Sequence, residues 1–105
     1  MTEDTFRRIA LSMPEAVESE HMGHPDFRVK GKTFATLFAR GEEIRGMVKL
    51  KPAQQRRLVK SRPDAFEPVN GAWGRQGCTQ VCLDAVDKRT LHEAMVLAWR
   101  HAAPK

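Results

Sequence analysis

The stretch FRVKGKTFATLFA, residues 27–39, decides which fold class this sequence can adopt. Its two runs, FRVK and TFATLFA, are separated by Gly31 and Lys32, which is the pattern of a β-hairpin with a tight two-residue turn. Phe27 and Val29 alternate with two cations, so one face of the first strand should be buried and the other should meet solvent. We therefore expect an antiparallel sheet.

Further helix and strand patterns flank this hairpin. Residues 17–22 could form a short extended stretch, but residues 21–25 contain a glycine and a proline and are expected to form a loop. The expected order of elements is a helix capped by Thr2 and ended by Pro14, strands over 27–30, 33–39 and 44–51, a helix over 53–61, strands over 66–69 and 78–84, and a helix capped by Asp87.

This order indicates an α+β fold with two layers. The terminal helices carry apolar stripes, and they should cover one face of an antiparallel sheet of about five strands. The 105 residues suit a single domain over 1–105. The first residues lack the basic start and apolar run of a signal peptide, and no apolar stretch approaches a membrane span. We expect a soluble, cytoplasmic monomer that does not contact membranes.

Charge is concentrated in one block of the chain. Residues 28–62 contain eleven Lys or Arg residues against only Glu42 and Glu43, a net charge of +9, whereas the whole chain has a net charge of +5. Such a block favours anionic partners such as phosphate backbones. A basic surface is therefore expected somewhere on the folded chain.

The chain resembles the MmcQ/YjbR-like family of small bacterial proteins. The resemblance rests on residues 13–18 (MPEAVE), 24–37 (HPDFRVKGKTFATL), 47–52 (MVKLKP), the Trp-Gly loop, 78–84 (CTQVCLD) and the Ala98–Trp99 pair. It implies a two-layer α+β fold related to frataxin-like and secretion-chaperone-like domains. Members are commonly labelled DNA-binding, because their hairpins are interpreted as a double wing. Residues 71–77 (GAWGRQG) depart from the relatives' pattern, so no functional residue is transferred there.

Strand alternation suggests where the basic residues gather. Arg28, Lys30, Arg45 and Lys49 should share the sheet face that points away from the helices, and Lys32 should sit at the hairpin tip. This surface could follow phosphates, whose attraction is independent of sequence. The alternative is a solvated face that keeps the protein soluble.

Aromatic residues could add stacking to this surface. Phe27, Phe34 and Phe38 are expected in the core, which leaves Trp73, with Arg75 beside it, as the stacking platform. The glycines around Trp73 could instead expose backbone N–H groups to an anion, or only form a turn.

Metal and catalytic signatures are weak. His21, His24 and Asp26 could supply three ligands, but no fourth is apparent. Cys78 and Cys82 lie about 13 Å apart on one strand, too far to share an ion, and both should be reduced. No nucleophile stands beside a base. We expect no metal, no cofactor and no enzymatic activity.

Three functions remain open from the sequence. The first is a non-enzymatic nucleic-acid-binding domain that uses the basic sheet and hairpin surface. The second is a protein-interaction or chaperone-like adaptor that receives an acidic partner segment on the open sheet face. The third is a small-molecule or anion pocket near His24, Trp73 and Arg75, which a deep apolar cleft would favour.

Overall fold

Antiparallel hairpins build most of this molecule. The computed structural model describes residues 1–103, so residues 104 and 105 of the expected domain lie outside it. The elements in chain order are α1 (Glu3–Leu11), β1 (Ala16–His21), β2 (His24–Val29), β3 (Lys32–Arg40), β4 (Glu43–Lys49), α2 (Pro52–Ser61), β5 (Phe66–Pro68), α3 (Ala72–Arg75), β6 (Cys78–Val81) and α4 (Lys88–Ala102). The α+β fold with an antiparallel sheet is confirmed.

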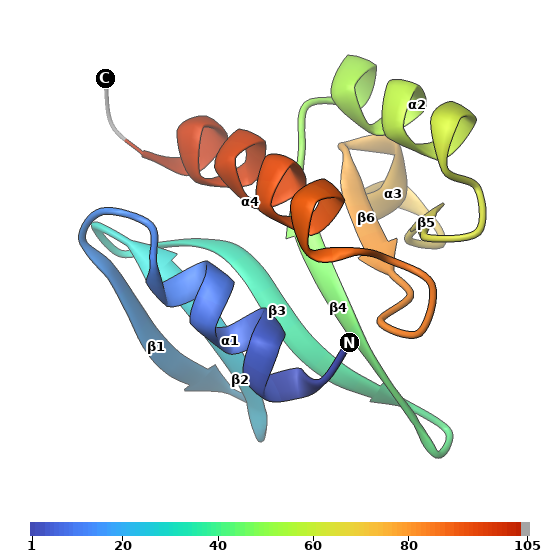
Figure 1. The fold of residues 1–105 in the computed structure, drawn as a ribbon. Helices are drawn as coiled ribbons and strands as arrows, with labels where there is room; N and C mark the ends of the chain where they lie inside the picture. Colours follow the sequence, from blue (N-terminus) through green and yellow to red (C-terminus); the bar gives the residue numbers. More distant parts are fainter. Residues whose placement is uncertain (104–105) are drawn as a thin grey trace.

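The six strands form one sheet in the order β1-β2-β3-β4-β6-β5, and every neighbouring pair is antiparallel (Figure 1). The sixth strand is β1, which falls on the extended stretch considered over 17–22. In place of the loop expected over 21–25, the chain makes a tight turn and begins β2. Met22 and Gly23 have φ values of 52° and 82°, as a tight hairpin turn requires. Pro25 is tolerated because the pairing of β2 with β3 begins only at Asp26, so Pro25 has no partner in β3 that would need its missing N–H.

The turn of the central hairpin lies one residue earlier than expected. Lys30 and Gly31 have φ values of 49° and 82°, and the pair formed by Val29 and Lys32 closes the hairpin. The turn places glycine at its second central position, a usual preference of this turn type. Consequently Lys30 lies in the turn rather than on the sheet face, and Lys32 begins β3 rather than forming the tip.

Helices α1 and α4 lie side by side over one face of the sheet (Figure 1). Both are capped as expected, since Thr2 Oγ1 accepts from the N–H of Thr5 and Asp87 Oδ2 accepts from the N–H of Thr90. The largest fully buried side chains include Phe6, Phe27, Phe34, Leu37, Val48, Val81, Leu91 and Met95. Together they form the core between the helices and this covered face.

The other helices lie toward the β5 end of the sheet. Leu58 of α2 joins the hydrophobic core, and α2 contacts β5. Within residues 1–103, no helix is long and apolar enough to span a membrane. The opposite face of the sheet carries no long helix in Figure 1, and we call it the open face.

Candidate functional site

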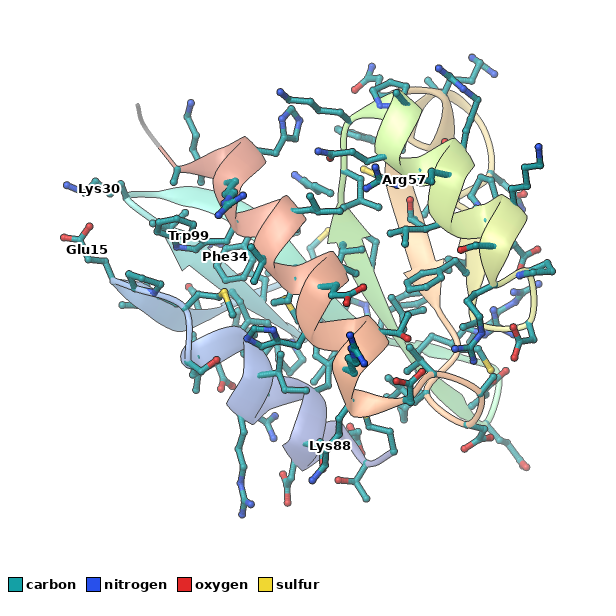
Figure 2. All side chains as sticks on the ribbon, turned by 45° about the horizontal axis from the view of Figure 1, so that its top comes forward. Glu15, Lys30, Phe34, Arg57, Lys88 and Trp99 are labelled. Atoms are coloured by element: carbon teal, nitrogen blue, oxygen red, sulfur yellow. The ribbon has the colours of Figure 1, made fainter. Side chains whose placement is uncertain are left out.

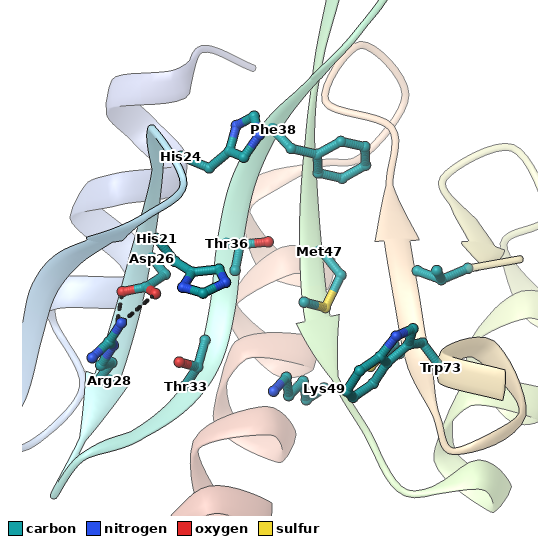
Figure 3. Close-up of a pocket in the computed structure, with 12 residues that line it drawn as sticks. His21, His24, Asp26, Arg28, Thr33, Thr36, Phe38, Met47, Lys49 and Trp73 are labelled. Carbon is teal, nitrogen blue, oxygen red and sulfur yellow. Dashed lines mark hydrogen bonds and ion pairs between the residues drawn. The ribbon is translucent and has the colours of Figure 1, made fainter. Parts of the chain in front are cut away.

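A groove of about 490 Å³ hollows the open face of the sheet (Figure 3). Side chains from β2, β3 and β4 form its floor, and α3 closes one side. The residues that line this sheet groove are His21, His24, Asp26, Arg28, Thr33, Thr36, Phe38, Met47, Lys49, Val69, Trp73 and Cys78. The volume lies in the range of ordinary ligand-binding clefts.

The floor of the sheet groove is largely apolar. Phe38 and Met47 are half-buried and point into it, although Phe38 was expected in the core. The physical reason is a register shift: Phe27 pairs with Ala35, but the next residue, Arg28, pairs with Thr33. The extra residue in β3 reverses the alternation beyond it, as a β-bulge does, and so places Phe38 on the open face.

An ion pair forms the polar end of the groove. Arg28 donates from Nε to Asp26 Oδ1 at 3.0 Å and from Nη2 to Asp26 Oδ2 at 2.9 Å. These hydrogen bonds raise the pKa of Arg28 above its ordinary value. Asp26 is only 2% exposed, and both of its carboxylate oxygens accept a hydrogen bond from Arg28. The pair presents little net charge to a ligand.

Trp73 forms the wall opposite this pair. Its ring is attached to α3, yet the residue is 63% exposed, and Lys49 Nζ lies 5.9 Å from the ring centre, within cation–π range. The sequence predicted a loop over these residues, whereas the structure has a single helical turn. A large aromatic residue is thus held at the protein surface beside an apolar hollow.

Buried contacts fix the position of α3. Gln55 of α2 donates from Nε2 to the carbonyls of Gly74 and Cys78, at 2.9 and 3.0 Å. A Cβ on Gly74 would collide with the carbonyl of Val69. Gly74 therefore allows the close packing that presents the ring of Trp73. The many glycines around Trp73 were visible in the sequence. The residue that anchors this segment, Gln55, was not.

Carboxylates neutralise the far end of the open face. Arg45, only 16% exposed at its side chain, lies 3.2 Å from Glu43 and 3.3 Å from Glu67. Arg40 Nη1 also donates to Glu67, at 3.3 Å, and to Gln80, at 3.2 Å. A phosphate could bind these arginines only by sharing them with the two glutamates.

Comparison with known proteins adds the family. The family model described as YjbR matches residues 11–101. The chain belongs to the YjbR family. Two crystal structures share the fold: protein DR2400 from Deinococcus radiodurans (TM-score 0.76, 20% identity, covering 93% of this chain and 75% of that one), and a protein from Pseudomonas syringae (TM-score 0.70, 14% identity, covering 97% and 99%). No curated protein matches the sequence.

The structure of this YjbR-family chain brings together three of the seven residues singled out from the sequence. Arg28, Lys49 and Trp73 line the sheet groove. Lys30 lies in the hairpin turn, 3.7 Å from Glu15 (Figure 2). The remaining three lie outside the groove lining: Lys32 is exposed at the start of β3, Arg45 lies at the far end of the open face, and Arg75 is exposed on α3.

His21, His24 and Cys78 line the groove, whereas Cys82 lies in a different hollow beside Arg45. His21 and His24 pair across the first hairpin, but Arg28 occupies the carboxylate of Asp26. In the part of the chain that the structure describes, no three His, Cys, Asp or Glu side chains are arranged to hold a metal ion. Both cysteines are free, and burial raises the pKa of the Cys78 thiol.

Sequence reasoning missed several groove residues. Thr33, Thr36, Phe38 and Met47 lie on the floor, and only Met47 was assigned to the outward face by alternation. The bulge in β3 hid Thr36 and Phe38, which follow it, because its position depends on pairing with β2 rather than on local sequence.

Proposed function

We propose that this chain is a non-enzymatic domain that binds single-stranded nucleic acid on the open face of its sheet. The observation that carries the proposal is Trp73, which is 63% exposed at the side of an apolar groove with the Lys49 amine 5.9 Å from its ring centre. Aromatic platforms next to cations are the usual means of binding unpaired bases without strong sequence preference.

A single strand suits this surface better than a duplex. The open face offers an apolar floor with Phe38 and Met47, to which unpaired bases can present their faces. A duplex presents mainly phosphates, and two of the expected phosphate ligands, Arg28 and Arg45, are already paired with carboxylates. Lys49 remains the groove cation with no carboxylate within 4 Å in residues 1–103, and it would contact the phosphate of the stacked nucleotide.

The test is the binding of a fluorescent 15-nucleotide oligo(dT) to wild type, Trp73→Ala and Trp73→Phe, measured by anisotropy at about 50 mM salt. Stacking of one base contributes about 1–3 kcal/mol, so Trp73→Ala should weaken binding by roughly 5- to 150-fold, and Trp73→Phe by much less. Val17→Ala is the control, because Val17 is exposed on β1, outside the groove lining. No binding by wild type, or equal binding by Trp73→Ala, would overturn the proposal.

A small planar molecule is the second candidate. The observation that favours it is the groove itself, whose volume of about 490 Å³ and apolar floor suit such a ligand. The length of the oligonucleotide distinguishes the two candidates. A single-strand site should gain affinity steadily from a mononucleotide to a 15-mer, whereas a small-molecule site should not.

The adaptor function, in which the open face receives an acidic partner segment, makes a different prediction. An oligoglutamate peptide should then bind to wild type, while oligonucleotides should not.

A further inference from the structure

We propose that the exposed face of α2 binds the phosphate backbone of the strand whose bases stack at Trp73. The residues of this basic helix face are Arg56, Arg57 and Lys60, with Lys51 just before the helix. The inference rests on the proposed function and gives it a second contact surface. The ligand class is the phosphodiester backbone of a single-stranded nucleic acid.

The spacing of these cations puts them on one side of the helix. Lys60 follows Arg57 by three residues and Arg56 by four, and all three are exposed. The other side of α2 carries Gln55 and Leu58, which are buried. The helix contains no acidic residue. Its exposed face is therefore uniformly positive.

The cations of α2 differ from those of the sheet in their partners. Within residues 1–103, five of the eleven cations in the basic block have a carboxylate within 4 Å: Arg28, Lys30, Arg40, Arg45 and Arg62. The cations of the basic helix face are not among them. A phosphate that binds there disrupts no ion pair of the described structure, and arginine can hold it with two hydrogen bonds.

Hydrogen bonds join the inner side of α2 to the groove wall. Gln55, on the inner side of α2, donates to the carbonyls of Gly74 in α3 and of Cys78 in β6. Trp73 belongs to α3, and Cys78 lines the groove. Figure 2 labels Arg57 at the α2 end of the molecule, opposite the hairpin turn with Lys30. The proposal places a strand that stacks on Trp73 over α3 and on to the exposed face of α2.

The experiment compares salt dependence in two matched pairs of charge removals. Arg56→Ala/Arg57→Ala removes two charges from α2, and Lys88→Ala/Arg89→Ala removes two exposed charges from the first turn of α4. Each lost phosphate contact to a single strand should flatten the slope of log K against log salt by about 0.7, so the α2 pair should flatten it by about 1.4. The α4 pair should leave the slope almost unchanged. Arg56→Lys/Arg57→Lys should restore most of it.

The outcomes separate the two proposals. If Trp73→Ala weakens binding while the α2 pair keeps the wild-type slope, the α2 assignment is wrong and the proposed function stands. If both pairs of substitutions flatten the slope equally, the α2 assignment is also wrong, because only net charge would then matter. If wild type binds no oligonucleotide, the proposed function fails. Circular dichroism of each variant confirms that these surface changes leave the fold intact.

Discussion

The two faces of the sheet use the same strands for different purposes. In β4, Val48 points to the covered face and is fully buried, whereas its neighbours Met47 and Lys49 point to the open face and are half-buried. The covered face supplies the apolar core under α1 and α4, and the open face supplies the groove. Substitutions should therefore separate stability from binding, according to which face they alter.

The largest expected effect is on the covered face. Phe27 is fully buried and its ring centre lies 6.1 Å from that of Phe6. Phe27→Ala should lower the free energy of unfolding by about 3–5 kcal/mol, the usual cost of truncating a buried aromatic residue. Urea unfolding measures this cost. Phe38→Ala, on the half-buried floor of the groove, is the matched comparison, and an equal loss there would mean that the open face is as much core as the covered one.

A smaller effect is expected where α4 begins. Asp87 accepts hydrogen bonds from Thr90 and from Arg62. These contacts hold the pKa of Asp87 well below its ordinary value, and the contact with Thr90 has the larger effect. A carboxyl group with a lowered pKa in the folded state stabilises fully above its unfolded pKa of about 3.9, and this contribution is lost as pH falls through the folded value.

Asp87→Asn tests this point, since asparagine can still cap the helix but cannot titrate. Wild type should be more stable than Asp87→Asn at pH 6, and the difference should shrink as pH falls below about 4. Thermal unfolding across this range measures it. A difference that stays constant down to pH 2 would contradict the role of the charge at Asp87.

Local patterns predicted the architecture well. The central hairpin, the caps at Thr2 and Asp87 and the apolar stripes of the terminal helices depend on residues a few positions apart, so the sequence exposes them. The predicted position of Lys30 was wrong, because the hairpin turn lies one residue earlier than the sequence suggested. The placement of Phe38 was wrong because a bulge depends on the pairing of two strands.

The open face was harder to predict than the fold. The charge block suggested a positive sheet surface, but Glu67 reaches Arg40 and Arg45 from β5, more than 20 residues away in sequence. Asp26 lies just before the block and neutralises Arg28. Net charge along a sequence does not report these pairs, because they depend on which strands become neighbours.

The smallest effect on stability is expected for Glu67→Gln, which removes a carboxylate shared by Arg40 and Arg45 on the open face. Glu67 is about half exposed at its side chain, and exposed ion pairs contribute only about 0–1 kcal/mol, so the free energy of unfolding should change by less than about 1 kcal/mol. Its effect on the charge of the open face should be larger, because two guanidinium groups lose their shared partner. If one of these guanidinium groups then reaches a phosphate of bound oligo(dT), the slope of log K against log salt should steepen by about 0.7.

The control is Glu93→Gln on α4, which makes the same change in net charge away from the sheet and should leave the slope unchanged. An unchanged slope in Glu67→Gln would mean that phosphates do not reach this end of the open face, and it would limit the binding role of that face to the groove beside Trp73.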